Sequence, residues 1–191
     1  PYSKESMNEF LNSKPDQYCS LDTCLSMAAN AFKKSRSISS KTKSKYLLGI
    51  AITANLATTY EKKGDHKFFI VVQTDSYTKY LECFIDKGTR TREEEEELIT
   101  GCVINLLAES CSLKYDLPQI QEEIKINQID AEKPWKKLFN NKVGFISNNK
   151  NKPELIFPGS FNPLHEGHLK MKELAEKKTG MHTTFEICAK N

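Results

Sequence analysis

The sequence lacks long apolar runs, paired cysteines and an excess of charge of one sign. No stretch approaches the roughly 18 consecutive apolar residues of a membrane-spanning helix, so we expect no membrane span. The 28 basic and 25 acidic residues leave a net charge of +3, which is too balanced to predict a nucleic-acid partner. The six cysteines form no C-x-x-C pair, which favours reduced thiols over a disulfide framework or a zinc site and indicates a cytoplasmic protein.

The sequence also begins without an initiator methionine or a signal peptide. Its first residues, Pro-Tyr-Ser-Lys-Glu-Ser, have no apolar core of the kind that directs secretion, so we expect a fragment of a longer cytoplasmic protein. The 191 residues are enough for one medium domain or two small ones.

Apolar periodicity predicts an α/β fold. The expected elements are helices over 5–12 and 20–34, strands over 46–52, 68–72 and 77–85, and a long helix over 89–112. The runs at 46–52 and 68–72 are continuously apolar, which is typical of strands buried on both faces, whereas 77–85 alternates and is expected nearer an edge. The acidic run 93–97 is expected on a solvated helix face.

The composition changes after the long helix. Residues 114–152 are mostly polar, with a thin isoleucine stripe and one short helix expected at 134–139. The chain's only tryptophan, Trp135, is expected to plug a core or a domain interface and not to stack on bases. We therefore expect domains over 1–113 and 153–191, joined by a linker over 114–152.

A strand–turn–helix pattern follows this linker. The apolar run within 154–158 predicts a strand, 164–178 contains strong helix formers, and Gly180 is placed to cap the helix end. A further strand is expected over 183–188, parallel to the first because a right-handed crossover connects them. Ligands of open α/β sheets bind at such turns.

The residues of the turn suit a phosphate group. Gly159 allows close approach of a ligand to the backbone, and the amides of 159–161 with the helix N-terminus are expected to form an anion site. His165 and His168 are three residues apart, so both lie in the first turn of the helix. The helix dipole disfavours imidazolium there, which leaves neutral rings that can donate N–H bonds to phosphate. Gly167 leaves the space above the helix end open.

This stretch resembles the G-[ST]-F-[DN]-P-x-H-x-G-H signature of the nucleotidylyltransferase superfamily, and most closely that of the nicotinate and nicotinamide mononucleotide adenylyltransferases. The matching residues are Gly159, Ser160, Phe161, Asn162, Pro163, His165, Gly167 and His168. The resemblance implies a doubly wound Rossmann-like domain that transfers the adenylyl group of ATP to such a mononucleotide and releases pyrophosphate. It also implies Mg²⁺ bound with ATP, catalytic roles for His165 and His168, and phosphate or nucleotide binding by Gly159, Ser160, Phe161, Asn162 and Gly167, with no metal-ligating residue in this chain.

The resemblance is incomplete. The family's second signature, an I-S-S-T-x-x-R-type segment that clamps the triphosphate, has no counterpart here, and a doubly wound sheet needs several more strands. We therefore expect this chain to carry the first βαβ unit of a truncated domain and the intact product to continue.

The first domain carries a second resemblance. Gly49-Ile-Ala-Ile-Thr53, Glu61-Lys62 and Phe69-Ile-Val-Val72 are similar to the later part of the CinA C-terminal domain family, an α/β sandwich that includes nicotinamide-mononucleotide amidases. The resemblance implies nucleotide contacts at Thr53 and Lys62. The family's glycine-rich phosphate loop is replaced here by Ala54-Asn-Leu-Ala-Thr-Thr59, so we expect a degenerate domain.

Several alternatives remain open at this point. The two histidines also fit half of a metal site, solvated helix-start residues without a role, or the H-x-G-H of class I aminoacyl-tRNA synthetases. In place of an adenylyltransferase, the chain fits a nucleotide-binding or scaffold protein with decayed domains, or a CinA-type amidase. The expected partners are ATP and a mononucleotide, with no nucleic acid and no membrane, and the oligomeric state is left open.

Overall fold

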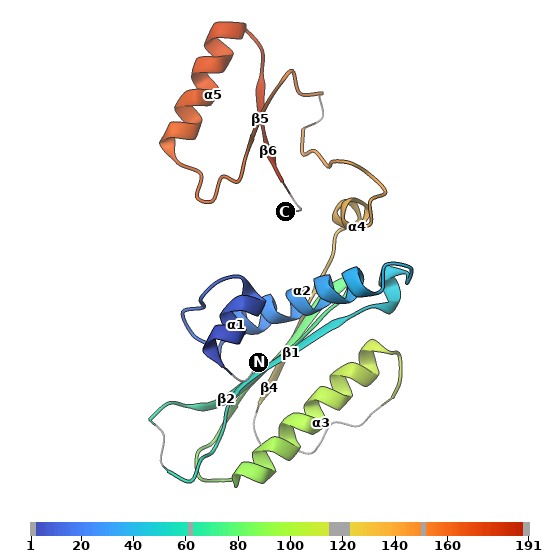
Figure 1. Cartoon of the computed structure of the whole chain (residues 1–191), viewed down its shortest axis with the longest axis vertical. Coiled ribbons are helices and arrows are strands. Elements are labelled where there is room, and N and C mark those ends of the chain that lie inside the picture. Colours follow the sequence, from blue (N-terminus) through green and yellow to red (C-terminus); the bar gives the residue numbers. More distant parts are fainter. Residues whose placement is uncertain (1–2, 61–62, 115–122, 150–151, 189–191) are drawn as a thin grey trace. The chain divides into compact units, whose positions relative to one another are not determined.

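The computed structural model describes residues 3–60, 63–114, 123–149 and 152–188. The chain forms two compact units, Pro1–Gly144 and Phe145–Asn191. The first contains a four-stranded sheet and the second a two-stranded sheet, which confirms the expected α/β class (Figure 1). Among the described residues, no helix is both long and apolar enough to cross a membrane.

The sheet of the first unit is an antiparallel meander. Its strands are β1 (Gly49–Asn55), β2 (His66–Gln73), β3 (Tyr77–Ile85) and β4 (Ile124–Asp130), in that order across the sheet. Each strand pairs with the next in a continuous register, for example Ile52 opposite Ile70, and Ile70 opposite Leu81. The tight connection between β2 and β3 is closed by a hydrogen bond from the Thr74 amide to the Tyr77 carbonyl (2.9 Å).

Helices cover both faces of this sheet. On one face lie α1 (Lys4–Leu11) and α2 (Leu21–Ile38), and on the other lies α3 (Arg92–Ser110) (Figure 1). Side chains of β2 alternate between the two resulting cores, with Phe68 and Ile70 facing α3 and Phe69 facing α2. Because β2 is buried on both sides, its continuously apolar sequence is explained and the expected buried strand at 68–72 is confirmed.

Side-chain caps set the helix starts. The Ser20 hydroxyl accepts from the Thr23 amide at the start of α2, and Thr91 forms a capping box with Glu94 at the start of α3. Gly49 allows α2 to pack closely on β1, since a Cβ at this position would lie 2.2 Å from the Ala28 carbonyl oxygen. α2 continues to Ile38, several residues beyond the expected helix end.

The order of the strands corrects two expectations. The strand expected at 46–52 is β1, which starts three residues later and lies at an edge of the sheet. It is not buried on both faces, because Thr53 is buried but Ile52 is 40% exposed. Residues Ser44–Tyr46 form a short 3-10 helix, η1. β3, expected nearer an edge, lies in the interior because β4 pairs with it.

The expected linker is partly folded into the first unit. β4 and the short helix α4 (Lys133–Phe139) both fall within 114–152, and the boundary between the units follows Gly144. The Arg36 guanidinium donates to the Phe139 carbonyl (2.9 Å) and so ties α4 to α2. The sequence pattern was weak because β4 is an edge strand whose only half-buried residue is Ile124. Residues 115–122 and 150–151 of this stretch lie outside the described residues.

The second unit has the expected strand–helix–strand order. β5 (Leu155–Gly159) and β6 (Thr183–Ile187) are parallel, with Phe157 opposite Phe185, and α5 (Glu166–Thr179) connects them. Gly180 adopts a left-handed conformation (φ 71°) and its amide donates to the Glu176 carbonyl, which confirms the expected glycine cap.

Two buried thiols of the first unit should resist alkylation. Burial raises the pKa of Cys24 to about 12 and that of Cys102 to about 11. Both therefore remain neutral thiols in the folded protein as the pH is raised from about 8 to about 10, and the thiolate is the reactive form. We expect iodoacetamide to modify the exposed Cys111 in the native protein, and Cys24 only after unfolding, as measured by peptide mass spectrometry. Equal native labelling of Cys24 and Cys111 would contradict this prediction.

Candidate functional site

The turn between β5 and α5 is folded around the ring of Phe161. Phe161 has a left-handed backbone (φ 48°), and the following Asn162–Pro163 peptide is cis. The ring folds back over Gly159, where an added Cβ would lie 2.7 Å from the Phe161 Cζ. Gly159 was expected to leave space for a ligand, but in the structure that space accommodates the Phe161 side chain.

Phe161 joins an aromatic cluster that supports the turn. Its ring makes edge contacts with Phe157 (5.4 Å between centroids) and Phe185 (4.7 Å), which lie on the two strands. On its other side it contacts the His168 ring at 5.1 Å with nearly perpendicular planes. His168 is therefore held against packed rings and is half-buried, whereas Ser160 and Asn162 are exposed.

The two histidines cap the start of α5 together. His165 is the N-cap residue, and its Nδ1 accepts from the Gly167 amide (3.2 Å). Nδ1 of His168 accepts from the His165 amide (3.4 Å), and the two rings stack with centroids 3.7 Å apart. Gly167 makes room for this arrangement, because a Cβ there would meet the His165 ring at 3.0 Å.

This capping assigns one tautomer to both rings. A ring nitrogen that accepts a hydrogen bond carries no proton, so a neutral imidazole with Nδ1 as acceptor has its proton on Nε2. Nε2 lies across the ring from Nδ1, so both side chains present an N–H donor away from the backbone. The two rings that carry these donors stack on each other at the helix start.

The backbone amides of the helix start have internal partners. The Gly167 amide is bonded to His165 Nδ1, and the amides of His168 and Leu169 donate to the His165 carbonyl at 3.0 and 3.4 Å. The helix part of the expected anion site is therefore revised, whereas its part on the amides of 159–161 stays a prediction. The imidazole Nε2–H groups, and not these three amides, are the donors that this end of α5 offers to a ligand.

The described residues provide no preformed metal site. They contain no group of three or more His, Cys, Asp or Glu side chains that could hold a metal ion. Glu166, the carboxylate nearest the histidines in sequence, pairs with Lys170 (3.3 Å).

Of the second pair of expected site residues, Thr53 and Lys62, the structure describes only Thr53. Thr53 is buried between β1 and α2, where its hydroxyl donates to the Ser20 carbonyl (3.3 Å). Lys62 lies outside the described residues. Thr53 belongs to the first unit and the histidine turn to the second.

A buried His–Glu pair in the first unit was missed by the sequence interpretation. Glu95 lies within the acidic run that was expected on a solvated face, but it is fully buried. Its Oε1 lies 2.8 Å from His66 Nδ1, and its Oε2 accepts from the Ala57 amide (2.6 Å). The signal was present in the spacing, because Glu95 is three residues before Leu98 and shares the buried stripe of α3.

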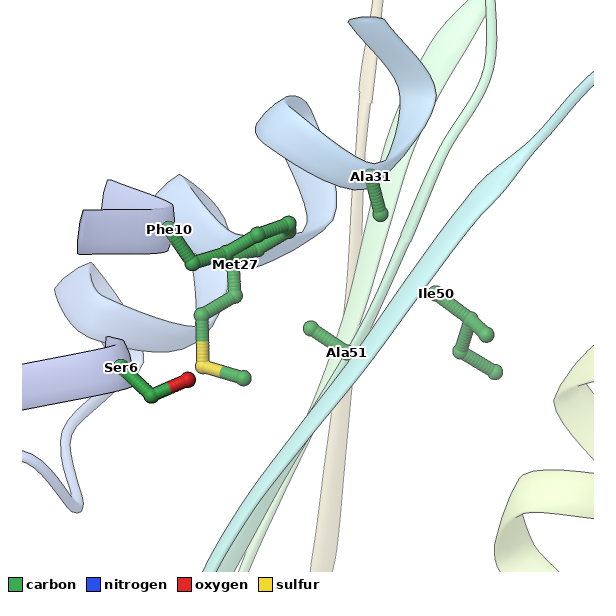
Figure 2. A pocket seen from close by; sticks show the side chains of 6 residues that line it. All are labelled: Ser6, Phe10, Met27, Ala31, Ile50 and Ala51. Carbon is green, nitrogen blue, oxygen red and sulfur yellow. The ribbon is translucent and has the colours of Figure 1, made fainter. Parts of the chain in front are cut away.

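A shallow apolar hollow of about 310 Å³ lies between α1, α2 and β1. Figure 2 shows Met27, Phe10 and Ala51 gathered on one side of β1, with Ile50 pointing to the other side. Ser6 is the one polar side chain among the six residues that line it, and none of the six is an acid or base that could activate the Ser6 hydroxyl as a nucleophile.

No protein-family model, curated protein or solved structure matches this chain. The residues and geometry of the β5–α5 turn are thus the basis on which a function can be assigned.

Proposed function

We propose that the turn over residues 158–168 binds the triphosphate of ATP and belongs to a nucleotidylyltransferase site. The acceptor would be a mononucleotide such as nicotinamide or nicotinate mononucleotide. The observation that carries this proposal is the stacked pair His165 and His168, whose Nδ1 atoms cap the backbone and leave the Nε2–H of each ring as a donor. N–H donors on two stacked rings suit the oxygens of a phosphate chain.

The reaction needs few chemical groups from the protein. A phosphate oxygen of the mononucleotide attacks the α-phosphorus of ATP, the bond to the β-phosphate oxygen breaks, and pyrophosphate leaves with the electron pair. The rate of such a transfer depends on positioning and on stabilising charge on the phosphate oxygens. His165 and His168 would supply that stabilisation through Nε2. Mg²⁺, when bound with ATP, would neutralise phosphate charge.

We also infer that the unit β5–α5–β6 is the first βαβ of a Rossmann-like domain, since its strands are parallel and the motif lies at the carboxyl end of β5. The first unit is proposed to be a degenerate CinA-like domain. The buried Thr53, bonded to a backbone carbonyl, gives no support to the amidase alternative.

The proposal predicts a response of two particular histidines to ATP. In a long-range ¹H–¹⁵N correlation spectrum, the Nε2 signals of His165 and His168 should shift when ATP and Mg²⁺ are added to the full chain. His182, in the same unit but paired with Glu176 (3.1 Å), is the internal control. Adding nicotinamide mononucleotide to the full-length protein should then release pyrophosphate.

Each outcome decides between the alternatives. Shifts at both histidines with pyrophosphate release support the transferase. Shifts without release would reject transfer by this chain and leave the nucleotide-binding alternative. Spectra in which His165 and His168 respond no more than His182 would reject both.

A further inference from the structure

The positive charge of the chain is concentrated in two segments. Residues 33–46 contain six Lys or Arg and residues 133–142 contain four, and neither segment contains an Asp or Glu. The rest of the chain has 18 basic against 25 acidic residues, so the net charge of +3 conceals a strongly basic region. The overall balance, which predicted no nucleic-acid partner, is therefore misleading about this region.

These segments lie side by side at one end of the first unit. The Arg36 guanidinium donates to the Phe139 carbonyl (2.9 Å), and the Ser44 hydroxyl donates to Asn140 Oδ1 (2.7 Å). Lys136 Nζ donates to the Ser76 hydroxyl (2.9 Å), which adds the β2–β3 turn. Figure 1 shows α4 beside the C-terminal end of α2. We call residues 33–46 and 133–142 the basic surface.

Aromatic rings are exposed on the basic surface. Trp135 is 43% exposed and stacks with Phe139, with centroids 6.1 Å apart and planes inclined by 26°. Tyr46 is 70% exposed, and Lys45 Nζ lies 4.6 Å from its ring centroid. Trp135 was expected to plug a core or a domain interface, and it is not part of either buried cluster of the first unit.

We propose that the basic surface binds single-stranded nucleic acid. Lysine and arginine side chains neutralise the phosphates of a strand, and exposed ring faces beside them stack on its unpaired bases, which is the combination found in proteins that bind single strands. A membrane is a poorer match. α4 has seven residues, of which three are lysine, and offers only Trp135, Leu138 and Phe139 as large apolar side chains for burial in lipid.

The single tryptophan provides a direct measurement. Because Trp135 is the only tryptophan, its fluorescence reports this surface alone. We expect uridine and thymidine oligonucleotides of about ten residues to quench it, since each base can stack on the ring, and the affinity to fall steeply as salt is raised. Comparing the two oligonucleotides shows whether RNA or DNA is preferred.

Paired charge reversals test the location. Lys43→Glu with Lys45→Glu changes two exposed side chains of the basic surface and should weaken binding on the order of tenfold and reduce the salt slope by about one to two. The matched control is Lys14→Glu with Lys63→Glu, which also changes two exposed lysines. Lys14 precedes the start of α2 and Lys63 the start of β2, whereas the basic surface lies at the ends of these two elements. We expect the control pair to weaken binding by no more than about twofold. Trp135→Leu, followed by anisotropy of a labelled strand, should weaken binding about tenfold.

Three results would overturn the proposal. The first is that the control pair weakens oligonucleotide binding as much as Lys43→Glu with Lys45→Glu, which would indicate a general attraction of the strand to positive charge anywhere on the protein. The second is binding of polyphosphate as tight as that of the oligonucleotides, with Trp135→Leu without effect, which would leave a polyanion surface without base stacking. The third is a blue shift of Trp135 with phosphatidylserine vesicles and no response to either oligonucleotide, which would assign the surface to a membrane. Circular dichroism of each variant confirms that it is folded.

Discussion

Replacing His168 by asparagine is expected to lower the rate of pyrophosphate release from ATP and nicotinamide mononucleotide by about 100-fold or more. The asparagine Oδ1 can take the place of Nδ1 and accept from the His165 amide, so the helix cap is kept. Nothing replaces the outward Nε2–H donor. The loss should therefore appear mainly in kcat, because the donor acts on charge that builds up in the transition state.

The matched control is His168→Gln, whose amide nitrogen reaches close to the position of the histidine Nε2 and can still donate. It should retain more activity than His168→Asn, although both variants lose the aromatic contact with Phe161. Near-wild-type turnover by His168→Asn would sink the assignment of His168 as a phosphate donor. Loss of activity in both variants to the same extent, with a lowered melting temperature, would reduce His168 to a support for the turn.

The elements that the sequence predicted well are those whose burial is uniform. β2 is covered by helices on both faces, so its apolar residues run without interruption and no other structure competes with a strand. The strand–turn–helix at 155–179 is bounded by proline and glycine, whose backbone preferences are local. In both places the signal lies within a few neighbouring residues.

Strand order depends on contacts that are distant in sequence. β3 was expected near an edge because its apolar and polar residues alternate. In the structure β4 pairs with it and takes the edge position, and β4 is itself an exposed strand with a weak apolar pattern. An edge strand buries few side chains, so the isoleucines of β4 could not be distinguished from those of a polar linker. For the same reason, the sequence did not show that β4 and α4 belong to the first unit, although the boundary after Gly144 does lie within the expected linker.

At the candidate site, the sequence predicted which residues meet but not how they are used. His165 and His168 do lie together at the start of α5, as their spacing required. The roles of the glycines differ from expectation because Gly159 and Gly167 make room for rings of the motif itself. Ring packing of this kind follows from the left-handed backbone of Phe161, which no residue type in the motif specifies.

The second large effect is expected at Glu95, where substitution by alanine should lower the free energy of unfolding of the first unit by about 3–5 kcal/mol. The carboxylate is fully buried and bonded to His66 and to the Ala57 amide. Its removal leaves the buried His66 ring and the half-buried Ala57 amide without this partner, which costs more than the bonds themselves contribute. Urea unfolding followed by circular dichroism and by the fluorescence of Trp135, which lies in the same unit, measures the loss.

Glu97→Ala is the matched control, since it removes the same charge from an exposed position of the same acidic run and should change stability little. A Glu95→Ala variant no less stable than Glu97→Ala would contradict the buried pair. The double replacement His66→Phe with Glu95→Leu shows whether the stability comes from the His66–Glu95 pair or from the hydrogen bond between the Ala57 amide and Glu95. If the pair serves only packing, apolar residues of similar size should recover most of the stability, because neither partner is then left unpaired. If stability is not recovered, the bond from Ala57 to Glu95 is the essential contact, and Glu95 holds the loop after β1 against α3.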